Sequence, residues 1–79
     1  MESITNMIAA IAALLAKPKS EKVGLIRQLR KTLKRSEKTY FKAKRKFSRK
    51  GIDAKEQEQL DQLWKNMMDL SDEIENINN

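Results

Sequence analysis

Apolar side chains recur along most of the chain with alternating steps of three and four residues. Two runs follow this rhythm, one from Ile26 to Phe47 and one from Leu60 to Ile77, on either side of Gly51. Steps that average about 3.5 residues keep one narrow apolar seam on a helix, and such a seam requires a partner helix. The pattern therefore predicts two long helices packed on each other. The seam positions are Ile26, Leu29, Leu33, Ser36, Tyr40, Ala43 and Phe47 in the first run and Leu60, Leu63, Met67, Leu70, Ile74 and Ile77 in the second.

The two seams match each other when the helices run antiparallel. Facing residues then have numbers that add to 103, as Leu33 and Leu70 do. The small Ser36 faces the long Met67 in this register, so large and small side chains alternate as close packing requires. The pairing predicts an antiparallel coiled-coil hairpin.

The turn of this hairpin falls at Gly51, where the register has its midpoint. A glycine suits the left-handed residue that ends a helix, and Asp53 with Glu56 three residues later is the pattern of an N-cap with its capping box. A connection this short also forces the helices it joins to run antiparallel. The predicted bounds are a helix over about 21–50, a turn over 50–53 and a helix over about 54–77.

A third, apolar helix is predicted at the start of the chain. Ser3 is a candidate N-cap, and the segment from Met7 to Ala16 contains no polar residue. Pro18 stops this helix, and Ser20 is a candidate cap for the next. The predicted bounds are a helix over about 4–16 and a linker over 17–20. The large apolar side chains of the helix are Ile4, Met7, Ile8, Ile11, Leu14 and Leu15.

A helix that is apolar nearly all round must be covered on more than one side. Our preferred interpretation is that it folds back on the hairpin as a third bundle helix. The alternatives are that it contacts another subunit, or that it lies in a membrane interface. The apolar run is too short to span a bilayer, and the chain begins Met-Glu instead of with the basic start of a signal peptide. We therefore expect an intracellular protein or a component of a particle, with a membrane the less favoured partner.

The composition places the chain in the all-α class, as a single helical domain over residues 1–79. It has two glycines and one proline, and it contains neither cysteine nor histidine. A disulfide, a thiolate metal site, an imidazole base and a zinc site of the usual kind are thereby excluded. Asp69, Asp72 and Glu73 have helical spacing, but solvated helix faces look the same. We expect a protein that is not an enzyme, with no cofactor and no metal.

Charge is distributed very unevenly. Residues 27–50 hold twelve Lys or Arg against Glu37 alone, whereas residues 53–79 hold eight acids against two lysines, within a net charge of +6. Most of these side chains point away from the seam, so the hairpin has a basic face on its first helix and an acidic face on its second. The basic face consists of Arg27, Lys31, Lys34, Arg35, Lys38, Lys42, Arg45 and Arg49. The acidic face consists of Glu58, Asp61, Asp69, Asp72 and Glu75.

Four apolar residues lie outside the seam, namely Leu25, Phe41, Trp64 and Met68. We expect some of them to receive the first helix. The alternative is a surface that anchors a partner through Phe41, Trp64 and Met68, with Trp64 the favoured anchor because tryptophan is enriched at the energetic centres of interfaces.

These patterns favour a non-catalytic structural or interaction protein, a small helical building block or adaptor in a homo- or hetero-oligomeric assembly. Its expected contact surfaces are the basic face and the apolar first helix, and its expected partner is itself or another protein subunit. The alternative is an accessory protein that contacts a nucleic-acid backbone without sequence specificity, because eight cations along ~35 Å of helix match the scale of a phosphate backbone. A peripheral membrane protein is the third possibility.

Overall fold

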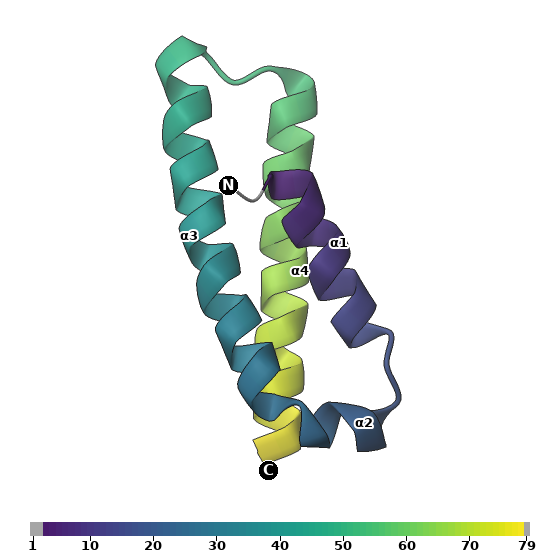
Figure 1. Cartoon of the computed structure of the whole chain (residues 1–79). Helices are drawn as coiled ribbons and strands as arrows, with labels where there is room; N and C mark the ends of the chain where they lie inside the picture. The colour runs from purple at the N-terminus through teal and green to yellow at the C-terminus, as the bar shows by residue number, and fades with distance from the viewer. Residues whose placement is uncertain (1–2, 79) are drawn as a thin grey trace.

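Four helices make up the computed structural model, which describes residues 3–78 (Figure 1). The helices are α1 (Ile4–Leu15), α2 (Lys19–Gly24), α3 (Ile26–Lys50) and α4 (Ala54–Asn78). The molecule is elongated, with extents of 43 × 20 × 17 Å. Helices α3 and α4 run side by side along its length, while α1 lies across them and α2 closes one end.

The long hairpin of α3 and α4 confirms the all-α class and the predicted packing of two long helices. Its buried centre is formed by seam residues that are almost completely shielded from water, including Leu29, Leu63 and Leu70. Ser36 is also fully buried, and its hydroxyl donates a 2.6 Å hydrogen bond to the carbonyl of Leu33 one turn earlier. A seam hydroxyl satisfied within its own helix needs no partner across the interface, so it can be buried at little cost.

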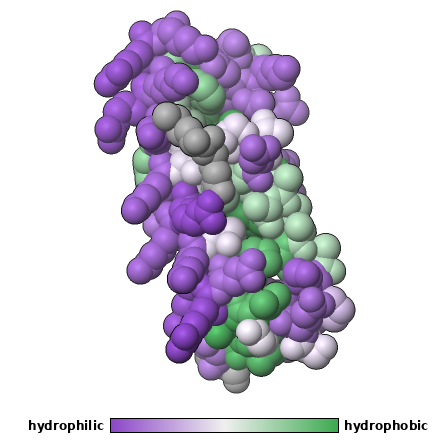
Figure 2. Space-filling view, viewed as in Figure 1, coloured by the Kyte–Doolittle hydropathy of each residue, from purple (hydrophilic) through white to green (hydrophobic). Residues whose placement is uncertain are grey.

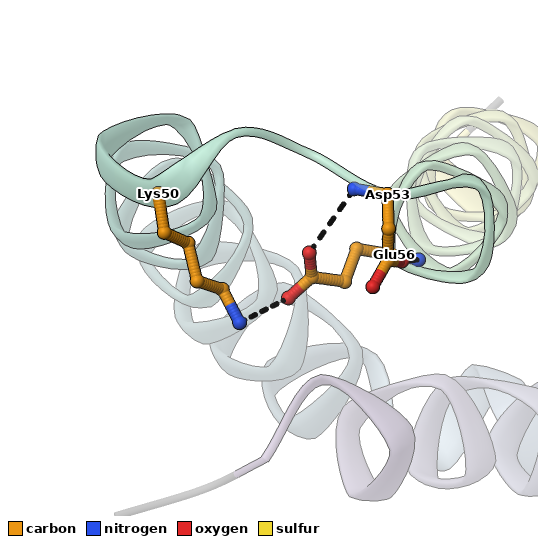
Figure 3. A network of polar contacts seen from close by, with 3 residues as sticks. All are labelled: Lys50, Asp53 and Glu56. Atoms are coloured by element: carbon orange, nitrogen blue, oxygen red, sulfur yellow. Dashed lines mark hydrogen bonds and ion pairs between the residues drawn. The ribbon is translucent and has the colours of Figure 1, made fainter.

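The turn between α3 and α4 has the predicted chemistry (Figure 3). Gly51 ends α3 with a φ of 87°, in the region that favours glycine. Asp53 Oδ1 accepts a 2.7 Å bond from the backbone N–H of Glu56, and Glu56 Oε1 accepts a 3.2 Å bond from the N–H of Asp53. The capping box is thereby confirmed. The second oxygen of Glu56 lies 2.9 Å from Lys50 Nζ, so one side chain both caps α4 and holds the end of α3.

Helix α1 packs on its own hairpin, as our preferred interpretation of the first helix had it. Ile4, Met7, Ile11 and Leu14 are buried in the same core as the α3 and α4 seam. Ser3 caps the helix by accepting a 3.1 Å hydrogen bond from the backbone N–H of Asn6, which confirms its predicted role.

The middle helix differs from the expected continuous segment over 21–50. It is interrupted at Leu25, which separates the short α2 from α3. The N–H of Leu25 bonds the carbonyl of Lys22, three residues back, so the chain tightens and turns there. Gly24 just before the break favours it, because glycine is among the weakest helix formers. Ser20 lies inside α2 instead of capping it, and Pro18 occupies the N-cap position without a side-chain bond.

Candidate functional site: the charged and aromatic faces of the hairpin

The basic face occupies the outer side of α3. All eight of its side chains are exposed. Helix α3 has 25 residues, so the face extends over ~37 Å at a rise of ~1.5 Å per residue. Figure 2 shows hydrophilic side chains gathered along α3, next to the apolar surface where α1 meets α4. An exposed row of cations on a rigid helix can bind an extended anionic surface.

One edge of the basic face borders an open hollow of about 600 Å³ beside the start of α1. Its cations come from α3, and its apolar floor comes from Ile4, Ala43 and Phe47. Such a hollow combines apolar contact with positive charge, which suits an acidic side chain or segment that also carries apolar groups. The α3 cations that line it are Arg35, Lys38, Lys42 and Lys46.

The acidic face lies on the outer side of α4, and all five of its predicted side chains are exposed. Asp61 Oδ1 accepts a 2.9 Å bond from Gln57 Nε2 one turn earlier. Within residues 3–78, no group of three acidic side chains is arranged to hold a metal ion. Glu73, which has helical spacing from Asp69 and Asp72, instead forms an ion pair with Lys22.

The first helix offers little of its expected contact surface to a partner. Ile4, Met7, Ile11 and Leu14 are buried, while Ile8 and Leu15 are half-buried and pack against the core. The outer side of α1 instead exposes small side chains, namely Ala9, Ala10, Ala12 and Ala13. A role for the six apolar residues as a contact surface would therefore require α1 to leave the hairpin.

The off-seam apolar residues do not receive α1, contrary to our expectation for Phe41, Trp64 and Met68. These three side chains are 53, 44 and 42% exposed. Helix α1 packs on the other flank of the hairpin, which carries the smaller buried side chains Thr32 and Asn66. Small side chains allow a closer approach between helices than bulky aromatic ones do.

Leu25, the fourth off-seam residue, is half-buried at the junction of α2 and α3. Its backbone carbonyl accepts a 2.9 Å hydrogen bond from the N–H of Leu29, which starts the hydrogen-bond ladder of α3. The residue therefore belongs to the break in the middle helix.

Two polar contacts that hold the helices together were not predicted. Asn66 Nδ2 of α4 donates a 3.2 Å bond to the carbonyl of Ile8 in α1. Lys22 Nζ of α2 lies 3.1 Å from Glu73 Oε1 of α4 and donates a 3.4 Å bond to the carbonyl of Leu15. Both join segments far apart in sequence, and neither has a local pattern that would reveal it.

Lys50, at the end of α3, has a shifted pKa. The hydrogen bond and the charge of Glu56 raise the pKa of the Lys50 ammonium above its ordinary value of 10.5, and burial opposes them. An opposite charge at hydrogen-bond distance favours the charged form. The ion pair behind this shift stabilises the turn, and Lys50 is not a residue of the basic face.

Comparisons with protein-family models, with curated proteins and with solved structures find no match for this chain. In the part of the chain that the structure describes, no helix is both long and apolar enough to cross a membrane.

Proposed function

We propose that this protein is a non-catalytic interaction module that binds an acidic protein surface through the basic face of α3, as a building block or adaptor in an assembly. The observation that carries the proposal is the exposure of all eight side chains of that face. The face lies on α3, whose seam side chains pack in the core and whose last residue, Lys50, forms an ion pair with Glu56 of α4. A rigid row of charge engages a complementary surface without ordering a flexible segment, and so binds at lower entropic cost.

The first candidate for the acidic surface is the acidic face of α4 on another copy. Its exposed carboxylates lie along α4, which has 25 residues, as α3 does. Stacking of a basic face on an acidic face is a heterologous contact, which extends into rings or filaments. Ion pairs formed there are solvent-exposed, so the assembly should weaken as salt rises.

A phosphate backbone is the second candidate, supported by the length and spacing of the same cations. Binding of this kind is independent of base sequence and falls steeply with salt through counterion release. The apolar lining beside Lys38 and Lys42 favours protein, because the half-buried Ala43 and Phe47 offer contact surface that a phosphate chain does not use.

The test replaces Lys31, Lys38 and Lys42 by Gln, which removes three cations from the centre of the basic face. Light-scattering mass should show species larger than two chains at low salt in the wild type, and these should disappear in the variant. The matched control replaces Lys19, Lys55 and Lys65 by Gln, which lowers the net charge equally at exposed positions outside the face. The control should keep the larger species.

The same variants distinguish the two ligands. Titration with a short DNA duplex of mixed sequence should show weak binding in both variants and the wild type if the partner is protein. If nucleic acid is the ligand, the three-site variant should lose affinity, and its dependence of log K on log salt should flatten by about 0.9 per lost contact. Loss of neither large species nor duplex binding in the variant would refute the proposal.

A further inference from the structure

One flank of the hairpin carries a cluster of apolar side chains, of which Phe41, Trp64 and Met68 are exposed and Tyr40 is half-buried. We call Tyr40, Phe41, Trp64 and Met68 the aromatic face. The ring of Tyr40 lies 5.3 Å from that of Trp64 across the two helices and 5.2 Å from that of Phe41. Met68 follows Trp64 by one helical turn. Exposed apolar residues are ordinary singly, but a contiguous group of large ones marks a contact surface.

The aromatic face lies opposite the flank that α1 covers. Trp64 is two residues from Asn66, which bonds α1, and side chains two residues apart point about 200° apart around a helix. Phe41 has the same relation to Thr39, which borders the hollow beside α1. The core of the hairpin is therefore covered on one flank by α1 and left open on the other.

Charge borders the aromatic face with opposite signs on its two sides. On the α3 side are Arg30, Lys34 and Arg45, which we call the basic rim. On the α4 side are Asp61, Asp72 and Glu75, which we call the acidic rim and which the single cation Lys65, one turn from Asp61 and from Met68, interrupts. All six rim side chains are exposed. Each lies on the same side of its helix as Phe41 or Trp64, at spacings of whole turns. An acidic rim repels a phosphate backbone, so this face does not suit nucleic acid.

We infer that two copies of this chain associate through their aromatic faces, about a two-fold axis parallel to α3 and α4. Such a rotation places the α3 of one copy on the α4 of the other and forms a four-helix bundle with both α1 helices outside. The basic rim of each copy then meets the acidic rim of its partner. A two-fold axis in the interface but perpendicular to the helices would stack α3 on α3, basic rim on basic rim, and is disfavoured by charge.

The heights of the residues agree with this arrangement. A rotation about an axis parallel to the helices leaves every residue at its own height, and the contact between Tyr40 and Trp64 shows that facing residues have numbers adding to about 104. Phe41 of one copy therefore meets the partner's Trp64. In the same way Arg45 comes within one turn of the partner's Asp61, and Arg30 within one turn of the partner's Asp72.

The remaining positions of the interface fit as well. Lys34 reaches the height of the partner's Met68 and Asp72, so its alkyl stem covers an apolar side chain while its ammonium meets a carboxylate. Glu37 is the one acid beside the basic rim. It stands at the height between the partner's Asp61 and Asp72, about one and a half turns from each, so it does not oppose either directly.

The basic rim shares Lys34 and Arg45 with the basic face, and the acidic rim belongs to the acidic face, so the uncharged anchors Phe41 and Met68 are the residues whose replacement separates this inference from the proposed function. Sedimentation equilibrium over a concentration series should give a mass approaching twice the 9.2 kDa of one chain. Replacing Phe41 and Met68 by Gln should weaken the dimer by about 100-fold or more, as expected for central apolar anchors. Both side chains are largely exposed, so the helical circular dichroism should be unchanged. Val23→Gln is the matched control, since Val23 is 50% exposed but lies on α2.

The rim contacts are tested by charge reversal. Arg30→Glu with Lys34→Glu makes one variant, and Asp72→Lys with Glu75→Lys makes another. Each alone should be monomeric, because like charges then face each other at both rims. An equimolar mixture should form heterodimers, because both of its interfaces are again complementary. The triple Lys31, Lys38 and Lys42 variant should still dimerise.

Trp64 supplies a direct optical readout, since it is the one tryptophan of the chain. Its emission should shift to shorter wavelength and its quenching by acrylamide should fall as the dimer forms. A wild type that stays monomeric throughout the concentration series would overturn the inference. So would a dimer that the Phe41 and Met68 variant retains, or a charge-reversal mixture that stays monomeric. The Phe41 and Met68 variant keeps every charge of the basic face, so it should still bind an acidic partner there.

Discussion

The side-chain amide of Asn66 in α4 donates a hydrogen bond of 3.2 Å to the backbone carbonyl of Ile8 in α1. Gln62 Nε2, one turn earlier in α4, donates a 2.9 Å hydrogen bond to Asn66 Oδ1. This second bond fixes the orientation of the Asn66 amide. Asn66 is buried, and its oxygen and nitrogen both have partners. The contact therefore specifies where along α4 the otherwise uniform apolar surface of α1 docks.

Asn66→Asp is expected to loosen α1. The substitution replaces the donor with a carboxylate oxygen opposite a carbonyl, so a buried charge is left without its hydrogen bond, at a cost of about 1–3 kcal/mol. Urea unfolding followed by circular dichroism measures the loss. Gln62→Ala is the control, because it removes a bond at an exposed side chain and should cost under about 1 kcal/mol. Equal losses in the two variants would contradict a docking role for Asn66.

Burial of α1 predicts a sharp contrast between neighbouring residues. Ile11 is completely buried, whereas Ala12 next to it is exposed. Ile11→Asp should destabilise the protein by several kcal/mol, because it removes a core side chain and buries a charge. Ala12→Asp should change stability by less than about 0.7 kcal/mol, the cost of helix propensity alone. Thermal unfolding of the two variants measures this difference. Equal melting temperatures would show that the placement of α1 is wrong.

The ion pair between Lys22 and Glu73 should stabilise the fold more than the pair between Lys17 and Glu21. The side chains of the first pair are 11 and 22% exposed, those of the second 37 and 52%. We expect Lys22→Met to cost about 1 kcal/mol, since water still reaches Glu73, and Lys17→Met to cost close to zero. A double-mutant cycle with Glu73→Gln isolates the pair from other effects. The same cycle on Lys17 and Glu21 is the comparison. If its coupling energy is as large as that of Lys22 with Glu73, the Lys22 pair has no special role in holding α2 on α4.

The sequence predicted the hairpin well because its determinants are local and periodic. The seam, the glycine at position 51 and the capping box of Asp53 and Glu56 each follow from residues a few positions apart. The break at Leu25 is different, because the helical pattern continues through it. Gly24 permits the turn, but the distant contact of Lys22 with Glu73 fixes where α2 lies.

Which flank of the hairpin receives α1 was also beyond the sequence. The sequence led us to expect that some off-seam apolar residues receive α1, but Phe41, Trp64 and Met68 remain exposed. Helix α1 lies on the flank of Thr32 and Asn66, where smaller side chains permit close approach. The same outcome leaves the aromatic face exposed, so the error in the predicted packing and the candidate dimer surface have one physical origin.

Lys50 should titrate abnormally because of Glu56. Its pKa is raised above 10.5 by the hydrogen bond and the charge of that carboxylate, so Glu56→Gln should lower it toward the ordinary value. Because the folded pKa exceeds the unfolded one, the stabilisation is fully present below pH 10.5 and is lost as pH rises through the raised value. NMR titration of the Lys50 side-chain carbon next to nitrogen measures the shift. Glu58→Gln is the control, because Glu58 is also a carboxylate of α4 but is exposed and forms no bond with Lys50, and the raised pKa of Lys50 should persist in this variant.

The register of the hairpin can be tested by cross-linking. Cysteines replacing Leu33 and Leu70 stand at facing seam positions and should oxidise to a disulfide within one chain. The contact of Tyr40 with Trp64 lies two layers further along and agrees with this register, because those residue numbers add to nearly the same sum. The control pairs Leu33→Cys with Ile77→Cys, which lies two helical turns away, or ~10 Å along α4, beyond the ~7 Å between Cα atoms that a disulfide spans.

Gel mobility under non-reducing conditions, with mass spectrometry of the linked peptides, identifies the bond that forms. Oxidation should be carried out at the lowest workable concentration. The inferred dimer places α3 of one copy on α4 of its partner, so at higher concentration a disulfide could also form between two chains. Mixing isotopically labelled and unlabelled chains distinguishes the two routes, because a bond within one chain never joins a labelled peptide to an unlabelled one. Preference for the Leu33 and Ile77 bond would shift α3 by two turns along α4, and would also displace Phe41 from the height of the partner's Trp64.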